Sequence, residues 1–310
     1  MPRQIARTAA IALAAAVAAA CGGSRLPAPA REVQVPTSDG VRLSARVLGS
    51  GPDTVIVPLA SVWGREMEPL ARGRTLLLYD PRARGASERV GGAERLGMER
   101  DIEDLEAVRR HFGSPRVALV AWSYFGAVAA RYAARHPGDV TRLVLVAPVP
   151  PRSGAYPRAT PMRAPQPDAR LQQLADSLAA LGDPVAACRA RNRAELAQST
   201  RGPASLDNLR SDPCVHPNEW ADSLQATLSV AFAGLRSYDW RQEARGIRAP
   251  TLVFTGTEDF APPAAAQDWA AQMNGRVVEV PGAGHFLHLD DPALVIETAD
   301  RFLRGAAPGP

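Results

Sequence analysis

Residues 116–148 constrain the fold of this chain more than any other stretch. An apolar run at 117–122 is suited to a buried strand and stops at Ser123. A helical pattern of small residues follows at 126–134, and a second apolar strand pattern returns at 143–146. The order is strand, sharp turn, helix, strand. A serine on such a turn is lifted off the end of a sheet, where its hydroxyl can meet a substrate.

The residues at this turn resemble the nucleophile elbow of the α/β-hydrolase superfamily, in the branch of proline iminopeptidases and esterases that carries a helical cap. The usual pattern is Gly-x-Ser-x-Gly, and here residues 121–125 read Ala-Trp-Ser-Tyr-Phe, with Gly126 one place later. The resemblance implies that Ser123 is a nucleophile. Phe125 is large where a small residue is expected, and the alternative is an ordinary serine that caps the next helix.

A serine hydroxyl becomes a nucleophile only with a histidine base, which in turn needs a carboxylate. Of the five histidines, His285 follows Gly-Ala-Gly after the last predicted strand, where the superfamily carries its base, while His288 better fits a helix cap. Asp259 ends a Gly-x-x-Asp pattern that resembles the family's acid loop, with Glu258 as the nearest competitor. The order Ser123, Asp259, His285 is the one that this superfamily uses.

An oxyanion intermediate requires backbone N–H donors. The resemblance assigns one donor to Tyr124, just after the nucleophile, and the other to the loop after an early strand. Most relatives have His-Gly there, whereas this chain has Pro58-Leu59. By position the donor is Ala60, with Leu59 as the alternative, because proline has no N–H. The charged loop at 80–87 also resembles a family motif and is interpreted as a structural turn.

Strands that alternate with helices predict an α/β chain with a mostly parallel sheet covered by helices on both faces. The resemblance makes this an α/β-hydrolase fold with an inserted helical cap. The expected core is formed by residues 32–148 and 248–306, and it starts with a hairpin of strands at 32–35 and 41–48. The proline-broken helical block at 149–247 is expected to lie over the strand ends, where such sheets bind ligands.

The N-terminus predicts export. Two arginines precede an apolar stretch at 9–20, so residues 1–20 read as a signal peptide that is too short for a confident membrane span. The small residues before Cys21 resemble a bacterial lipobox, which implies lipidation of Cys21 and a membrane anchor in the cell envelope. The Pro/Ala-rich residues 21–31 then form a tether. The alternative is a soluble secreted or periplasmic protein.

An exported chain meets oxidising conditions, so Cys188 and Cys214 are expected to form a disulfide, with two buried thiols as the alternative. Neither cysteine has metal-ligand spacing around it, and no metal or cofactor is expected. The net charge of +4 is small and the arginines are dispersed among acids, which argues against a nucleic-acid partner.

Taken with the family resemblance, these features predict a serine hydrolase that cleaves a small-molecule ester or a short peptide. Trp122 and Glu219 are the candidate substrate-binding residues. Glu219 is a candidate because cap carboxylates of the iminopeptidase branch hold a free amine. Glu219 alternatively is a solvated acid at a helix N-terminus. Two rival functions stay open: a lipid-anchored binding protein that lost the chemistry, suggested by Phe125 and Pro58-Leu59, and a cofactor-free peroxidase with the same triad.

Overall fold

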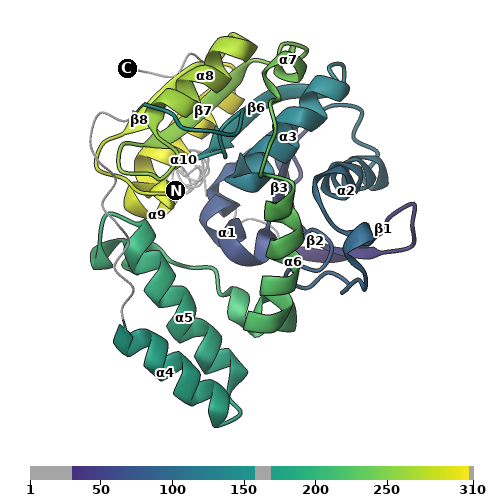
Figure 1. The fold of residues 1–310 in the computed structure, drawn as a ribbon. Coiled ribbons are helices and arrows are strands. Elements are labelled where there is room, and N and C mark those ends of the chain that lie inside the picture. The colour runs from purple at the N-terminus through teal and green to yellow at the C-terminus, as the bar shows by residue number, and fades with distance from the viewer. Residues whose placement is uncertain (1–29, 158–168, 307–310) are drawn as a thin grey trace, which may run out of the picture.

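A computed structural model describes residues 30–157 and 169–306. Its centre is an eight-stranded sheet with the strand order β1-β2-β4-β3-β5-β6-β7-β8 (Figure 1). Pairing is antiparallel from β1 to β2 and from β2 to β4, and parallel across the rest of the sheet. This confirms the predicted mostly parallel α/β architecture. The strands are β1 (Arg31–Pro36), β2 (Arg42–Leu48), β3 (Thr54–Pro58), β4 (Thr75–Tyr79), β5 (Val117–Trp122), β6 (Val140–Val146), β7 (Thr251–Gly256) and β8 (Arg276–Val280).

The antiparallel edge is the hairpin that the alternating pattern predicts. Its turn is closed by Thr37, whose hydroxyl oxygen accepts a hydrogen bond from the Val41 amide at 2.9 Å. Gly40 has a φ of 85°, a conformation that glycine reaches without steric cost. The turn of the hairpin is therefore closed by contacts among neighbouring residues.

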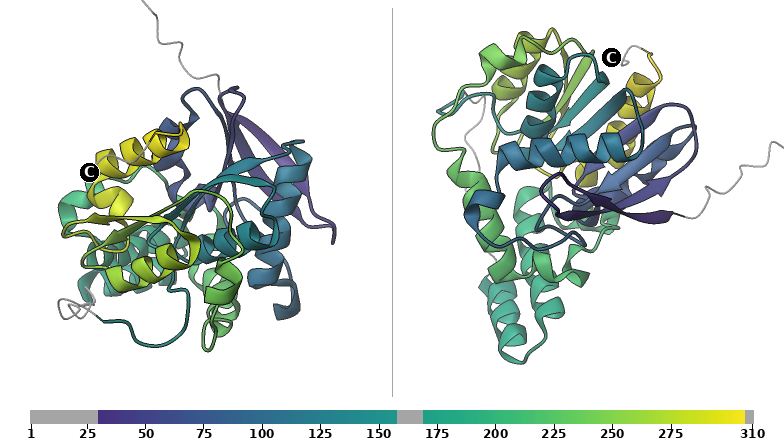
Figure 2. Two further views of the ribbon diagram at one scale, coloured as in Figure 1. Left: turned by 90° about the horizontal axis from the view of Figure 1, so that it is seen from above. Right: turned by 90° about the vertical axis from the view of Figure 1, so that its right-hand side faces the viewer.

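Helices cover both faces of the sheet, as Figure 2 shows from two directions. On one face α1 packs against β3 and β4, and α10 contacts β7. On the other face α3 packs against β5 and β6, between α2 and the pair α7 and α8. Every residue of β5 and β7 is buried, as expected for central strands covered on both sides. These helices are α1 (Ala60–Met67), α2 (Met98–His111), α3 (Tyr124–Arg135), α7 (Arg241–Ala244), α8 (Pro263–Met273) and α10 (Pro292–Leu303).

Between β6 and β7 the described residues form helices α4 (Ala169–Ala180), α5 (Pro184–Ser199) and α6 (Ala221–Ala233), several short turns, and then α7, which packs on the core. Helices α4 and α5 form a hairpin that projects from the core, and α6 lies beside the sheet (Figure 1). Prolines 203, 213 and 217 each open a 3-10 turn, since a proline is tolerated only at a helix start. These turns are η3 (Pro203–Asn208), η4 (Pro213–Val215) and η5 (Pro217–Glu219); the remaining short elements are η1 (Glu68–Ala71), η2 (Ala93–Arg95) and α9 (Leu287–Asp290).

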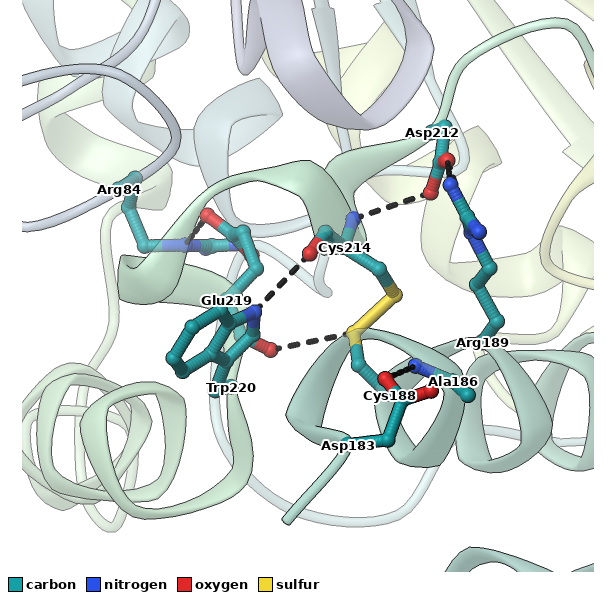
Figure 3. Close-up of a disulfide and its surroundings, with 9 residues drawn as sticks. All are labelled: Arg84, Asp183, Ala186, Cys188, Arg189, Asp212, Cys214, Glu219 and Trp220. Atoms are coloured by element: carbon teal, nitrogen blue, oxygen red, sulfur yellow. Dashed lines mark hydrogen bonds and ion pairs between the residues drawn. A yellow bond between two sulfur atoms is a disulfide. The ribbon is translucent and has the colours of Figure 1, made fainter. Parts of the chain in front are cut away.

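A disulfide joins Cys188 on α5 to Cys214 on η4, with the Cα atoms 5.6 Å apart (Figure 3). It therefore ties one helix of the projecting hairpin to the 3-10 turns that lie closer to the core. The predicted signal peptide, Cys21 and nearly all of the expected tether lie outside the described residues. Within residues 30–157 and 169–306, no helix combines the length and apolarity needed to cross a bilayer.

Candidate active site

Ser123 stands alone on the turn between β5 and α3, with φ 56° and ψ −126°. A non-glycine residue with positive φ is strained, and the strain persists only where the surroundings enforce it. Here the close approach falls at Gly126: a Cβ added to it would lie 2.9 Å from the Cβ of Pro148. Phe125 is buried on α3 and does not open the turn. Position 126, one place later than the usual pattern, is thus where this elbow needs glycine.

The structure brings Asp259 and His285 to Ser123 from the loops after β7 and β8. The His285 Nε2 lies 2.8 Å from the Ser123 Oγ, and its Nδ1 lies 3.1 Å and 3.2 Å from the two carboxylate oxygens of Asp259. Asp259 is 1% exposed and His285 is 8% exposed, while Ser123 is half-buried. Such a chain of contacts can move a proton from the hydroxyl to an imidazole that a buried carboxylate orients.

Backbone and ring contacts hold the imidazole of His285 in place. Its amide donates to the Ser199 carbonyl at 2.7 Å, and its ring packs against Phe260 with centroids 4.3 Å apart. The Trp122 indole N–H donates to the carbonyl oxygen of His285 at 3.0 Å, and the two rings lie 5.0 Å apart. Trp122 also lines the cavity, so the predicted substrate-binding residue is in addition a support for the histidine.

The first residues of two helices supply the candidate oxyanion donors. The N–H groups of Tyr124 and Ala60 open α3 and α1 and so have no carbonyl partner within their own helices. Leu59, the alternative donor, precedes α1 with φ 62° and lines the cavity, whereas Ala60 is buried and is not among the cavity's lining residues. The loop after β3 therefore reaches the site, and both assignments stay predictions.

A cavity of about 850 Å³ opens over Ser123 between the sheet and the cap, and Cys188 and residues of α5 and α6 line it from the cap side. This volume suits a small-molecule ligand. Much of the lining is apolar, and examples are Val62, Val149, Leu228, Phe260 and Phe286. Residues of α5 and α6 thus form part of the wall of the cavity over Ser123, which follows the carboxyl end of β5.

The sequence profile of the alpha/beta hydrolase fold family matches residues 59–292. The chain belongs to this family. A pimeloyl-(acyl-carrier protein) methyl ester esterase of Chromobacterium violaceum is 28% identical over 253 residues, which cover 79% of this chain and 91% of that protein.

Two solved structures show the same fold at low identity. A serine hydrolase from Cycloclasticus zankles superposes with a TM-score of 0.66 at 16% identity, over 89% of this chain and 98% of its own. A proline iminopeptidase from Mycobacterium smegmatis gives 0.62 at 20% identity, over 89% and 98%. The α/β-hydrolase fold is therefore shared with enzymes of different specificity, and the fold alone does not select among them.

The cap glutamate of this α/β-hydrolase is committed to an internal ion pair. Glu219 is 4% exposed, and its two carboxylate oxygens accept from the Arg84 guanidinium at 2.9 Å and 2.8 Å (Figure 3). The Gly85 amide donates to it as well, at 2.7 Å. The expectation of a solvated acid is wrong, because Glu219 is buried. Glu219 also lines the cavity, and the expected amine-binding role stays a prediction, with Arg84 and Gly85 already donating to its oxygens.

The loop at 80–87 is a structural turn, as the sequence indicates. The buried Asp80 accepts from the Ser61 amide at 2.8 Å and the Ala86 amide at 3.1 Å, so it fastens the loop to the start of α1. Burial raises the pKa of Asp80. A Cβ on Gly85 would lie 2.1 Å from the Asp80 Oδ2, which explains the glycine there.

Sequence reasoning missed several polar residues of the cavity, and one of them, Asp101 on α2, lies beside the elbow residue Tyr124. It is 7% exposed, and its Oδ2 accepts from the Tyr124 hydroxyl at 2.9 Å. Burial, reinforced by the nearby Asp104, raises the pKa of Asp101 to about 7. The only available signal was its place on α2, between the residues of the apolar stripe.

Proposed function

We propose that this α/β-hydrolase is a serine esterase that works through an acyl-enzyme. The observation that carries the proposal is the contact chain from Ser123 through His285 to Asp259, with a strained serine at one end and a buried carboxylate at the other. A hydroxyl within 2.8 Å of an imidazole nitrogen has its base within reach before a substrate arrives.

In the proposed reaction, the His285 Nε2 takes the proton of Ser123 as the Oγ attacks the ester carbonyl. The carbonyl oxygen becomes an oxyanion and receives hydrogen bonds from the Tyr124 amide and from Ala60 or Leu59. The imidazolium, oriented by Asp259, then gives its proton to the leaving alcohol as the C–O bond breaks. Water then attacks the carbonyl of the acyl-enzyme and gives a proton to the His285 Nε2. The imidazolium returns this proton to the Ser123 Oγ as the acyl–oxygen bond breaks, which releases the acid and restores the serine.

Two observations favour an ester over the N-terminal amide bond of a peptide. The one cap carboxylate proposed to bind a free amine, Glu219, is already paired with Arg84. The relative from Chromobacterium is by name a methyl ester esterase. Loss of catalysis was the rival suggested by Phe125, and the strained, hydrogen-bonded Ser123 argues against it. A cofactor-free peroxidase would use the same three residues, and no feature of the described chain favours it.

The test is covalent labelling of the protein with a sulfonyl fluoride, read by peptide mass spectrometry, together with hydrolysis of a short-chain aryl ester. We expect one label at Ser123, and Ser123→Ala should lower the rate by at least about a thousandfold. Ser229→Ala, a change at an exposed serine on α6, is the matched control and should keep both label and rate. An unlabelled Ser123 with ester turnover equal in Ser123→Ala would refute the esterase.

A prolyl-anilide assayed beside the aryl ester distinguishes an esterase from a proline iminopeptidase. Faster turnover of the anilide would replace the esterase by an iminopeptidase with the same triad. Peroxide-dependent oxidation in place of ester hydrolysis would favour the peroxidase.

We also propose that the chain is exported and held at the membrane of the cell envelope by a lipid on Cys21. The disulfide in the cap supports an oxidising compartment. The test is fractionation of cells expressing the full chain: wild type should pellet with membranes, and Cys21→Ser should not. Wild-type protein found free in the periplasm or medium would support the soluble alternative instead.

A further inference from the structure

Asp101 is a buried carboxylate with one oxygen left over. Its Oδ2 is bound by the Tyr124 hydroxyl. Its Oδ1 has no hydrogen-bond partner among the described residues, although the side chain is more than nine-tenths buried and lines the cavity over Ser123. This oxygen is not among the buried side-chain atoms that lack a partner, so it is open to the cavity, and a donor group of a ligand there can reach it.

The neighbouring arginines cannot serve as that occupant. Arg82 is committed to Asp104 at 2.6 Å and to Asp39 at 2.8 Å. Arg84 is committed to Glu219. Neither guanidinium comes within 4.0 Å of the Asp101 carboxylate in the described structure, so Asp101 has no ion-pair partner there.

The position of Asp101 relates it to the chemistry. Tyr124 is the residue after the nucleophile, and both its ring and Asp101 line the same cavity as Ser123. The rest of that cavity is largely apolar. A group bound at Asp101 therefore sits in the substrate space, next to the elbow, while the remainder of the substrate meets a wall that is mostly apolar but also carries charged side chains such as Arg191 and Glu195.

We propose that Asp101 is a specificity-determining residue whose Oδ1 accepts a hydrogen bond from a donor group of the substrate, a hydroxyl or a protonated amine. The inference rests on the proposed esterase and narrows its substrate class to esters that combine an apolar body with one hydrogen-bond donor. A plain alkyl ester leaves the oxygen unpaired and is the poorer substrate.

The experiment compares three series of aryl esters, whose acyl chains end in a methyl, a hydroxyl or an ammonium group. Each series covers the same range of chain lengths, so that esters of matched size are compared. For wild type we expect kcat/KM for one donor-bearing series to exceed that for the methyl series by about tenfold or more. Asp101→Asn keeps the shape of the side chain, and with its carbonyl oxygen paired to the Tyr124 hydroxyl its NH2 group faces the cavity, where it can donate to a substrate hydroxyl but cannot bind an ammonium group. It should retain the preference if the donor is a hydroxyl and lose it if the donor is an ammonium group.

Asp101→Leu removes the acceptor and should abolish either preference. Asp207→Asn is the matched control, since this exposed carboxylate lies outside the cavity lining, and it should keep the wild-type ratio. Partial unfolding of a variant lowers its turnover of all three series equally. It therefore leaves the ratio between the series unchanged and cannot be mistaken for a loss of preference. Equal turnover of all three series by wild type, or a preference that survives in Asp101→Leu, would overturn the inference. Failure of the esterase proposal is different: no series is turned over and Ser123 is not labelled.

Discussion

Asp101→Asn should make the protein less sensitive to rising pH. In the folded chain the pKa of Asp101 lies near 7, above its ordinary value of 3.8, with burial as the main cause and Asp104 as the second. Between these values the folded state holds a proton that the unfolded state has released. The free energy of unfolding therefore falls as pH rises from about 4 to about 7, and the loss is complete above 7.

The size of the effect follows from the gap between the two pKa values. A gap from 3.8 to about 7 corresponds to roughly 4 kcal/mol at 1.36 kcal/mol per pH unit. Asparagine cannot ionise, and its carbonyl oxygen can still accept from the Tyr124 hydroxyl. Removing the Asp101 charge also lets Asp104 ionise more easily. The measured difference in unfolding free energy therefore reports on Asp101 and Asp104 together. We expect the variant to gain up to about 4 kcal/mol on wild type between pH 4 and pH 8.

The assay is urea unfolding at pH 4, 5, 6, 7 and 8, followed by tryptophan fluorescence without reductant so that the disulfide stays closed. Asp207→Asn, at an exposed position, controls for the loss of one surface carboxylate. The quantity compared is the difference in unfolding free energy between variant and wild type at each pH. A difference that is flat across the range, or that shrinks as pH rises, would show that the folded chain does not hold the Asp101 proton and would refute the reasoning.

Three further predictions concern the elbow, the cap and the imidazole. Gly126→Val should cost about 1–3 kcal/mol, because its new Cβ meets the ring of Pro148 at 2.9 Å, and an unchanged thermal midpoint would contradict this. The double change Cys188→Ser and Cys214→Ser opens a loop of 26 residues and should cost roughly 3 kcal/mol in urea unfolding, whereas no loss would mean that the cap does not need the bond. Trp122→Phe removes the indole donor to the carbonyl oxygen of the triad histidine and should lower kcat about tenfold with little change in KM; an unchanged kcat with a raised KM would assign the ring to substrate binding instead.

Local sequence patterns were enough to predict most of the sheet. The hairpin, β8 and α10 follow from alternation, turn residues and the helical stripe, all of which act over a few residues. The start of β6 was missed, because Val140–Val146 begins with a polar stretch that pairing with β5 nonetheless holds extended. The loops that carry the three predicted triad residues were found because each follows its own strand.

Side-chain partners across long sequence distances could not be predicted. Glu219 lies 135 residues from Arg84, and nothing near Glu219 in the sequence announces that partner. Asp101 looks like one more acid on an amphipathic helix until Tyr124, 23 residues on, is seen to donate to it. Whether an acid is solvated, paired or left open to a cavity is decided by tertiary contacts, so the side-chain contacts within the cap and the specificity of the site remained beyond sequence reasoning.

One departure from the family pattern, Leu59, falls where the backbone is strained, and packing holds it there. Leu59 stands where most relatives have glycine and nevertheless takes the left-handed φ of 62°. Its side chain is 4% exposed, and its carbonyl accepts from the amides of Val62 and Trp63, which anchor it to the first turn of α1. Ser123 keeps φ 56° in the same way, beside the close contact at Gly126. Leu59 and Ser123 thus place two strained residues beside the proposed active site, and strained backbone of this kind clusters at functional sites.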